Sequence, residues 1–465
     1  MITTFRYSLS TILAVLDPND FKRIEADLFF KSISTSSLEC KPGTLFIPLK
    51  DKRDGHEFIL DALSRGATGF FCEKKHTILT KLNASQLQKA ILVDDTLASL
   101  GKLAKFHRRR FQPLLIAVTG SSGKTTTKEL LGNLFQFLKH RDIVVTEKNY
   151  NNEIGVPFTL FRINEYTKVA IIEMGMNQRG EIERLSRMSE PDLALITNIG
   201  SAHVENLKSP ERIAEEKSDI LLGMKESSTL FLPEDTSHLP IVTRKAKKLG
   251  VHLRLWKNGM SSSLKILEES KNGFKLNYRG HQIQWKVPGK TLLSNVRGMM
   301  EIGNYLKLED QKIAKAIGNY KLPASRLNIK KGYFQIIDDT YNANPESMLS
   351  SIQASYQLAN QQSLVLILGS MKELGKFSKY YHEQIGEALR QYPKVTLITY
   401  GKDAAWIAKK RKIGINFSFP DIHSNFEEFV KIVKEQHSKG TTILVKGSRS
   451  MKMERIVDCF LALKT

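Results

Sequence analysis

The chain has 465 residues, of which 41% are hydrophobic and 25% charged, and its formal net charge is +22. At ~150 residues per domain, this length predicts about three domains in an ordinary globular protein. The widely spaced Cys40, Cys72 and Cys459 exclude a disulfide framework and a cysteine-rich zinc site. No apolar run reaches the ~18 residues of a membrane span, and the first run is too short for a signal peptide. We therefore expect a cytoplasmic protein without stable membrane insertion.

The positive charge admits three kinds of partner, namely nucleic acid, a membrane surface or an anionic small substrate. The basic runs are short and dispersed, at 107–110, 244–248 and 409–412. No RNA-binding signature, zinc finger or basic strip with interleaved aromatics accompanies them. A solvated basic surface is the favoured interpretation, and attraction of a multiply anionic substrate is the second. No nucleic-acid partner is expected.

The chain opens with short strand-like runs at 44–49 and 69–72 and an amphipathic stretch at 57–65. A helix is expected at 96–110, and another at 124–139. Between residues 114 and 232, strand-like runs alternate with helical stretches, which predicts parallel βαβ units. These strands are expected at 114–118, 143–146, 169–173, 193–197 and 229–232.

Short alternating runs between 251 and 287, around Asn272-Gly273 and Arg279-Gly280, predict antiparallel hairpins appended to the parallel sheet. A second α/β series follows Pro323 and is expected to form a separate doubly wound domain. Its strands are expected at 334–338, 364–368, 395–400 and 442–445.

The predicted fold class is therefore α/β with three domains. Residues 1–95 form a small α/β domain for substrate binding. Residues 96–323 form a central P-loop ATPase domain built on a parallel sheet with the appended antiparallel segment. Residues 324–465 form a C-terminal Rossmann-like, doubly wound domain.

The strongest local signal is a glycine-rich turn between the strand at 114–118 and the helix at 124–139. Glycines let backbone N–H groups surround phosphate oxygens, and the helix N-terminus adds its positive dipole end. Lys124 supplies a cation for the terminal phosphates of ATP, and the Thr125 hydroxyl suits Mg²⁺. The predicted ATP-binding residues here are Gly120, Ser121, Ser122, Gly123, Lys124, Thr125 and Thr126.

The spacing of this loop is G-x-x-G-K-T, because Val118 stands where the common phosphate loop has its first glycine. The shorter loop argues against the usual GTPase and ATPase families. Glu173, at the end of another predicted strand, offers a hard oxygen ligand of the kind that Mg²⁺ prefers.

Several motifs in order along the chain resemble the ATP-dependent Mur ligases of bacterial cell-wall synthesis. The longest, Asp338-Asp339-Thr340-Tyr341-Asn342-Ala343-Asn344-Pro345-Glu346-Ser347-Met348, resembles the branch that adds D-alanyl-D-alanine to UDP-N-acetylmuramoyl-tripeptide. The resemblance also includes segments 41–46, 54–58, 119–126, 151–157, 173–175, 197–203, 324–326, 369–375 and 445–449.

This resemblance implies a ligase of the cytoplasmic stage of peptidoglycan synthesis, and with it roles in cell shape and cell division. The γ-phosphoryl of ATP is transferred to a substrate carboxylate, and the amine of the dipeptide attacks the resulting acyl phosphate. Phosphoryl transfer depends mainly on positioning and charge neutralisation. Two Mg²⁺ ions are implied, the first beside Lys124 and Thr125. The implied metal-site residues are Thr125, Glu173, His203 and Lys217, the last carbamylated by CO₂.

The remaining implied sites are nucleotide and substrate contacts. Asn295 and Asp339 are expected to bind ATP, and Arg326 is expected to reach the ATP phosphates when the domains close. The implied substrate-binding residues are Ser36, Ser37, His56, Asn151, Asn152, Tyr341, Asn344 and Ser347. We expect the ligase to act as a monomer.

Several positions depart from the family pattern, and Asp219 stands where glutamate is expected. Leu38 replaces the arginine of an N-terminal D-S-R motif, and Thr291 and Leu292 replace the first two residues of the H-N-x-x-N adenine motif. A catalytically dead relative is therefore one alternative, although the phosphate-loop, metal and lysine residues are all present.

Other ligases and ATPases are further alternatives. MurE and folylpolyglutamate synthetase share the loop and the chemistry, but MurE lacks the long C-terminal string, and its D-N-P-R type motif is not found here. A nucleic-acid-dependent ATPase fits the charge, but the candidate strand ends in Glu173-Met174-Gly175 instead of aspartate. The sequence leaves open whether the third peptide residue is diaminopimelate or lysine.

Overall fold

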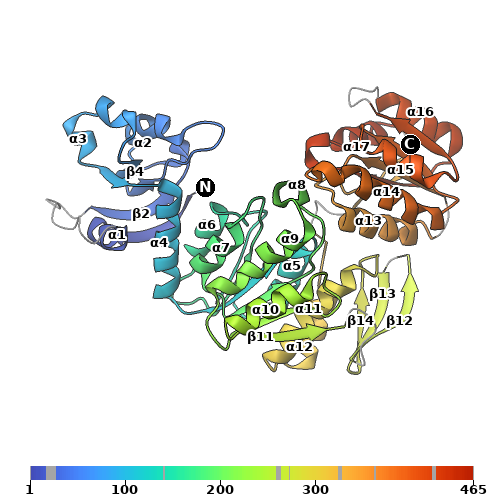
Figure 1. The fold of residues 1–465 in the computed structure, drawn as a ribbon, viewed down its shortest axis with the longest axis horizontal. Helices are drawn as coiled ribbons and strands as arrows, with labels where there is room; N and C mark the ends of the chain where they lie inside the picture. The colour runs from blue at the N-terminus through green and yellow to red at the C-terminus, as the bar shows by residue number, and fades with distance from the viewer. Residues whose placement is uncertain are drawn as a thin grey trace.

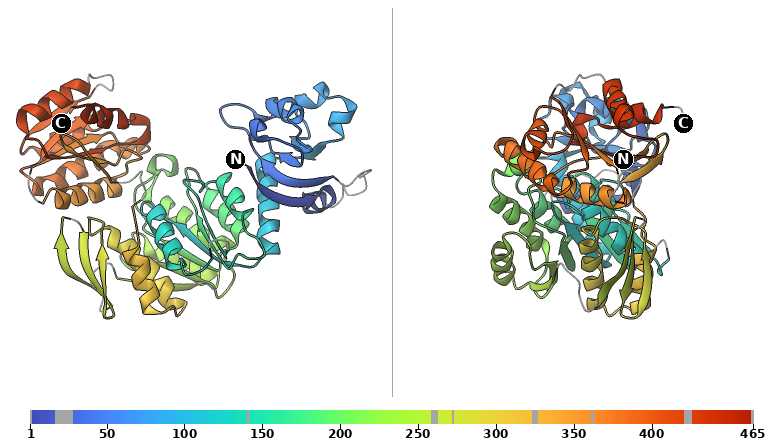
Figure 2. Two further views of the ribbon diagram at one scale, coloured as in Figure 1. Left: turned by 180° about the vertical axis from the view of Figure 1, so that it is seen from behind. Right: turned by 90° about the vertical axis from the view of Figure 1, so that its right-hand side faces the viewer.

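The computed structural model describes residues 2–16, 28–139, 142–257, 263–271, 273–322, 327–360, 363–420 and 426–463. An N-terminal and a C-terminal α/β unit lie at opposite ends of the molecule, and a larger α/β unit lies between them (Figures 1 and 2). None of the helices in these ranges is long and apolar enough to cross a membrane.

The N-terminal unit is built on a five-stranded sheet of order β1-β2-β3-β4-β5, in which only the β1–β2 pair is antiparallel. Phe46 and Phe70 of this sheet are buried in one cluster with Ile59 of α2. The strands are β1 (Ile2–Ser8), β2 (Phe29–Ser34), β3 (Thr44–Phe46), β4 (Gly69–Glu73) and β5 (Ala90–Val93). The helices are α1 (Leu9–Leu16), α2 (Ile59–Ser64) and α3 (Ala84–Leu87).

Helix α4 (Thr96–Arg110) joins this unit to the central one and has the predicted bounds. Asp95 caps the helix by accepting a hydrogen bond from the Ala98 N–H at 2.6 Å. The ring of His107 bridges the two units, because its Nδ1 contacts the Tyr7 hydroxyl at 2.8 Å and its Nε2 contacts the Ile163 carbonyl at 2.8 Å. The helix therefore belongs to the cores of both units.

The central unit is a six-stranded parallel sheet of order β11-β10-β9-β6-β8-β7. Alternate residues of β6 enter different hydrophobic cores, so both faces of the sheet are covered by helices. The strands are β6 (Leu114–Thr119), β7 (Ile143–Val145), β8 (Val169–Glu173), β9 (Leu193–Ile196), β10 (Thr229–Pro233) and β11 (His252–Trp256). The helices are α5 (Lys124–Leu134), α6 (Gly155–Leu160), α7 (Glu181–Ser189), α8 (Val204–Leu207), α9 (Pro210–Ser218), α10 (Leu239–Lys248), α11 (Leu292–Tyr305) and α12 (Asp310–Gly318).

The segment 251–287 was expected to be entirely antiparallel, and this prediction is wrong for its first part. Strand β11 pairs in parallel with β10, as the last strand of a β10–α10–β11 crossover, and its alternation reflects an exposed edge strand. The hairpins around Gly273 and Gly280 are confirmed as a separate three-stranded antiparallel sheet. Its strands are β12 (Leu264–Ser270), β13 (Gly273–Tyr278) and β14 (His281–Trp285).

Helix α5 is shorter than its periodicity predicts, because it ends at Leu134 and not near residue 139. Gly132 and Asn133, both weak helix formers, lie in its last turn. The N–H of Phe135 then bonds to the Gly132 carbonyl, and the chain continues as turns.

The C-terminal unit is a six-stranded sheet of order β15-β16-β20-β17-β18-β19, parallel except for β15. Helices α13 and α14 pack on one face and α16 and α17 on the other, which confirms the doubly wound prediction. The strands are β15 (Asn328–Lys331), β16 (Gln335–Asp338), β17 (Leu364–Gly369), β18 (Thr396–Tyr400), β19 (Asn416–Phe419) and β20 (Thr442–Lys446). The helices are α13 (Pro345–Leu358), α14 (Ser378–Ala388), α15 (Ala405–Arg411), α16 (Phe426–Gln436) and α17 (Glu454–Leu461).

The domain boundaries near residues 95 and 324 stay predictions. The first falls directly before α4, which packs on both neighbouring units. The second falls within residues 323–326, which lie outside the described ranges.

Candidate active site

The phosphate loop lies between β6 and α5, and two of its glycines admit close neighbours. A Cβ on Gly123, whose φ is 78°, would lie 2.5 Å from Oδ1 of Asn295. A Cβ on Gly120 would lie 1.8 Å from Oγ1 of Thr197. Larger residues at these positions would push the loop away from its neighbours. Asn295 of α11 is therefore packed directly against the loop, where the sequence predicted a nucleotide contact.

Part of the loop backbone is held by a side chain that the sequence analysis did not single out. Oδ1 of Asn198 accepts hydrogen bonds from the N–H groups of Ser121 at 3.1 Å and Ser122 at 3.0 Å. Its Nδ2 donates to Oγ of Ser122 at 2.7 Å. Asn198 thus holds these two N–H groups and shapes the loop, and their contact with phosphate stays a prediction.

Glu173 at the end of β8 is the centre of a buried polar cluster and is 2% exposed. Its Oε1 accepts from Nδ2 of Asn151 at 2.8 Å and from Oγ1 of Thr125 at 3.3 Å. Its Oε2 accepts no hydrogen bond from the described residues, although Nζ of the buried Lys128 lies 3.6 Å away. A buried carboxylate oxygen of this kind is suited to bind a cation.

Two lysines lie close to this cluster. Nζ of Lys124 donates to the Gly120 carbonyl at 2.6 Å. Lys217, on α9, is 1% exposed. Burial, and then the nearby charge of Lys124, lower the pKa of Lys217 well below its usual range. The burial of Lys217 therefore favours its neutral amine, and the side chain is not solvated.

His203 begins α8 and faces the C-terminal unit. Its Nδ1 lies 2.6 Å from Oε2 of Glu373. This contact lowers the pKa of the Glu373 carboxyl. The backbone N–H of Glu205 also donates to the Glu373 carbonyl at 3.0 Å. His203 thus takes part in a contact between the two units.

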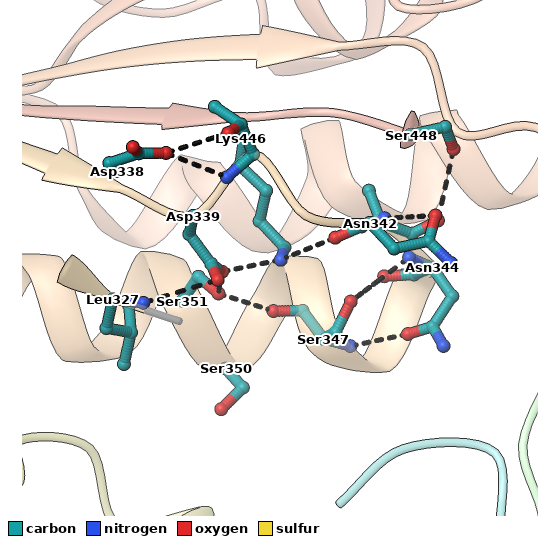
Figure 3. Close-up of polar contacts among 12 residues, drawn as sticks. Leu327, Asp338, Asp339, Asn342, Asn344, Ser347, Ser350, Ser351, Lys446 and Ser448 are labelled. Carbon is teal, nitrogen blue, oxygen red and sulfur yellow. Dashed lines mark hydrogen bonds and ion pairs between the residues drawn. The ribbon is translucent and has the colours of Figure 1, made fainter. Parts of the chain in front are cut away.

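In the C-terminal unit, Asp339 forms a buried ion pair. Its Oδ2 lies 2.5 Å from Nζ of Lys446 and accepts from Oγ of Ser351 at 2.5 Å (Figure 3). Lys446 also donates to the carbonyl of Asn342 at 3.0 Å. The pair fixes the end of β16 to β20 and holds the following loop in place.

The loop after β16 leads into α13 through a capping box. Oδ1 of Asn344 accepts from the Ser347 N–H at 2.8 Å, and Oγ of Ser347 accepts from the Asn344 N–H at 3.0 Å (Figure 3). Nδ2 of Asn344 also donates to the carbonyl of Ser121 in the phosphate loop, at 3.2 Å. Tyr341 is 39% exposed.

One cavity of 1250 Å³ lies between the central and C-terminal units. Its wall contains most of the residues that the sequence predicted, on both sides of the unit boundary. These are Ser121, Ser122, Gly123, Lys124, Thr125, Thr126, Asn151, Asn152, Glu173, His203, Asn295, Asp339, Tyr341, Asn344 and Ser347.

The predicted N-terminal substrate residues are not brought to this cavity. Ser36 and Ser37 lie in the turn after β2, where Ser37 is 7% exposed. His56 is completely buried, with Nδ1 2.7 Å from Asp54 and Nε2 3.3 Å from the Glu73 N–H. Both ring nitrogens are thus used within the N-terminal unit.

Asn152 lines the cavity, and its Oδ1 accepts from the N–H groups of Ile154 at 3.2 Å and Gly155 at 2.8 Å, where α6 begins. The predicted Arg326 lies outside the described residues.

The sequence analysis gave no role to Lys128, Asn198, Glu346 or Lys446. Three of the four stand inside motif segments, and Lys128 lies two residues after one. Their position in or beside these motifs indicated a role in the site. The hydrogen-bond partners of Asn198, Glu346 and Lys446, however, are far away in the chain. Their hydrogen bonds could therefore not be derived from spacing.

A phosphate loop on a parallel sheet, a buried carboxylate beside its threonine and a doubly wound unit across one cavity define a nucleotide-dependent ligase. The family models of the Mur ligase middle domain and the Mur ligase glutamate ligase domain match residues 118–301 and 325–449. The chain belongs to the Mur ligase family.

Similar proteins agree with this assignment along nearly the whole chain. A Bacillus subtilis protein named UDP-N-acetylmuramoyl-tripeptide–D-alanyl-D-alanine ligase is 34% identical over 91% of this chain and 92% of its own length. The structure of MurF ligase from Thermotoga maritima in complex with ADP is 27% identical, with a TM-score of 0.78, and covers 92% of this chain and 96% of that one. MurF from Acinetobacter baumannii shares the fold with a TM-score of 0.85 at 24% identity, over 99% of this chain and 100% of that one.

Proposed function

We propose that this enzyme joins D-alanyl-D-alanine to UDP-N-acetylmuramoyl-tripeptide, with ATP as the energy source and an acyl phosphate as the intermediate. The observation that carries the proposal is the shared cavity. Lys124 and Glu173 stand on its central wall, and Asp339 and Tyr341 stand on its C-terminal wall. The relatives that span the whole chain carry the name of this ligase, which supplies the identity of the substrates.

The chain's own residues account for the two chemical steps. A free carboxylate is a poor acyl donor, and phosphorylation by ATP gives it a leaving group. Lys124 is placed to neutralise the charge of the transferred phosphoryl, and the N-terminus of α5 lies beside it. The dipeptide amine then attacks the acyl carbon, the amide forms, and phosphate leaves. We assign Tyr341, Asn344 and Ser347 to the dipeptide side of the cavity.

Mg²⁺ fits the cluster around Glu173. Oε2 of Glu173 is a buried carboxylate oxygen without a hydrogen-bond partner among the described residues, and Oγ1 of Thr125 lies 3.3 Å from Oε1. Such hard oxygen donors are those that Mg²⁺ prefers. When bound, the ion would neutralise charge on the phosphates of ATP.

We also propose that Lys217 is carbamylated by CO₂ and belongs, with His203, to a second Mg²⁺ site. Carbamylation requires a neutral amine, and the lowered pKa of the buried Lys217 supplies one. The field of Lys124 would then stabilise the negative carbamate. In this proposal His203 exchanges its contact with Glu373 for the metal site.

The nucleotide and UDP-sugar contacts complete the proposal. Asn295, Asp339 and Arg326 contact the nucleotide, and Asn151 and Asn152 lie on the substrate side of the cavity. Ser36 and Ser37 bind the UDP-muramoyl part on the N-terminal unit. We propose that the enzyme works in the cytoplasm as a monomer, without nucleic acid or membrane insertion, and that its reaction serves cell shape and cell division.

One assay tests the reaction directly. Phosphate release from ATP is measured with UDP-N-acetylmuramoyl-tripeptide, with D-alanyl-D-alanine, with both and with neither, and the product is identified by mass spectrometry. Turnover that requires both substrates, with a product heavier than the UDP-N-acetylmuramoyl-tripeptide by two alanine residues, supports the proposal. Turnover that ignores the dipeptide, or that DNA stimulates, contradicts it.

A further inference from the structure

Helix α13 contacts the central unit along one of its faces. The contacting residues 346, 350 and 357 are spaced by four and seven positions, which places them on one side of a helix. Figure 1 shows α13 on the side of the C-terminal unit that faces α8 and the β12–β14 sheet. The polar contacts include Asn344 Nδ2 to Ser121 O (3.2 Å), Ser201 N to Glu346 Oε1 (2.7 Å), Thr291 Oγ1 to Ser350 Oγ (2.5 Å), Gly289 N to Gln357 Oε1 (2.8 Å) and Gln357 Nε2 to Ser270 O (2.8 Å).

Glu346, in the first turn of α13, is joined to the phosphate loop through Ser201 and Gly200. Its Oε1 accepts two hydrogen bonds from Ser201, from the N–H at 2.7 Å and from Oγ at 2.9 Å. The N–H of the preceding Gly200 donates to Oγ of Ser121 at 2.8 Å. A path of hydrogen bonds and one peptide unit therefore joins the carboxylate of the C-terminal unit to the phosphate loop.

Gly200 of the central unit leaves room for this carboxylate to approach closely. A Cβ on Gly200 would lie 2.4 Å from Oε1 of Glu346, so a larger residue there would displace the glutamate. Hydrogen bonds to an ionised oxygen are stronger than those between neutral groups. The charge of Glu346 is thus part of the contact, and an uncharged side chain of the same shape would hold Ser201 less firmly.

The second carboxylate oxygen of Glu346 distinguishes this residue from an ordinary surface acid. Its Oε2 is buried and accepts no hydrogen bond from any residue in the described ranges. The side chain also lies on the wall of the cavity that contains Lys124 and His203. Glu346 therefore connects the position of α13 to the part of the cavity where phosphoryl transfer is expected.

We propose that Glu346 is a positioning residue for the ligation reaction: by binding Ser201, it sets α13 and the dipeptide side of the cavity against the phosphate loop. The proposal rests on the function proposed above. The dipeptide-binding wall belongs to the C-terminal unit, and the activated carboxylate forms on the central unit. Small errors in their mutual placement lower the rate of the bond-forming step.

Kinetics of variants test this role. Glu346→Ala is expected to lower the kcat of ligation by about 10-fold to 100-fold, the scale on which misplaced reactants lose rate. Glu346→Gln, which keeps an acceptor oxygen, is expected to restore part of the loss. ADP affinity, measured by titration calorimetry, should change by less than about 3-fold, because the phosphate loop and Lys124 are unaltered. Glu428→Ala is the matched control, since Glu428 also lies in the first turn of a C-terminal helix and is exposed.

A double-mutant cycle with Ser201→Ala tests the contact itself. If Glu346 acts through Ser201, the two changes together should cost less in kcat than the product of the separate losses. Independent, multiplicative losses would overturn the proposed route. A Glu346→Ala enzyme with wild-type kcat, or one that loses ADP affinity and thermal stability together, would overturn the positioning role.

Hydrogen exchange separates a failure of this inference from a failure of the proposed function. In Glu346→Ala the Ser201 amide should exchange faster than in the wild type and in Glu428→Ala, whether or not the enzyme ligates a dipeptide. Unchanged protection of that amide would overturn the docking contact. A wild type that shows this protection but has no dipeptide-dependent turnover would refute the proposed function and the role of Glu346 in ligation. The contact between the two units would then still stand.

Discussion

The role of Lys124 in phosphoryl transfer can be tested directly by mutation. Its Nζ is held at the Gly120 carbonyl, at the mouth of the phosphate loop. Lys124→Ala is expected to reduce kcat at least ~10²-fold, because the transition state of phosphoryl transfer loses a charge-assisted partner. Steady-state phosphate release measures this, with the exposed Lys248→Ala on α10 as control. Near wild-type turnover would remove the phosphate loop from the mechanism.

Lys217 gives a second test at the residue scale. If its carbamate helps to hold Mg²⁺, Lys217→Ala should be nearly inactive, and short carboxylic acids should partly restore turnover by filling the vacated space. The exposed Lys225→Ala is expected to be active and indifferent to added acids. Full activity of Lys217→Ala without any acid would refute the carbamate. Loss of activity with no rescue by acids of any length would favour a packing role for the buried side chain.

Site residues could be predicted from the sequence where their contacts lie within one short segment of the chain. The phosphate loop is one continuous segment, so Lys124 and Thr125 could be assigned from the sequence, and the structure places them in the main cavity. Asn198 and Glu346 act through partners that are 76 to 145 positions away in the chain. Such contacts depend on how sheets and helices assemble, which no spacing rule encodes. His56 has both ring nitrogens engaged inside its own unit, and its role in substrate binding stays a prediction.

At the scale of elements, α4 is the joint between the N-terminal and central units, and His107 is its buried polar contact. Burial lowers the pKa of His107 to about 4. The unfolded chain, with an ordinary histidine pKa of ~6.5, therefore binds more protons than the folded protein between pH 6.5 and pH 4. The free energy of unfolding should fall in this window as the pH falls, by up to about 1.4 kcal/mol per pH unit, and His107 should have no such effect above it.

Chemical denaturation at pH 7.5 and pH 5 measures this contribution. His107→Gln is expected to lose stability at pH 7.5, because the contacts with Tyr7 and Ile163 are weakened. Its stability should then depend less on pH than that of the wild type. His252→Gln on the exposed edge strand β11 is the matched control. A variant with the same pH dependence as the wild type would show that His107 does not titrate in this window.

Sequence periodicity identified most elements but not all their ends or neighbours. The bounds of α4 and β8 were predicted correctly, because a cap or a change of pattern marks each end. Helix α5 was predicted too long, since its apolar face continues in turns after Phe135. Strand β11 was assigned to the antiparallel segment because an exposed edge strand alternates in the same way as a hairpin strand.

At the scale of the whole molecule, the sequence predicted three units but not how they are placed relative to one another. The cavity is shared by the central and C-terminal units, and no described residue of the first 95 lines it. Figure 2 shows the N-terminal unit at the end of the molecule opposite the C-terminal unit. A substrate held by Ser36 and Ser37 must therefore span a distance to the phosphate loop, or the units must approach one another when it binds.

The arrangement predicts compaction on ligand binding. Arg326 stands just before β15, at the start of the C-terminal unit, and is expected to reach the ATP phosphates only when the units close. Ligands that contact two units at once favour the closed arrangement.

Small-angle scattering measures this closure. The radius of gyration should decrease when an ATP analogue and UDP-N-acetylmuramoyl-tripeptide are added together, and less with either ligand alone. Arg326→Ala should bind both ligands but show a smaller decrease and a lower kcat, because the closed state loses a charge-assisted contact to phosphate. Arg390→Ala, a change at an exposed arginine of the same unit, should behave as the wild type. Unchanged scattering profiles together with a fully active Arg326→Ala enzyme would show that ligation needs neither the movement nor the arginine.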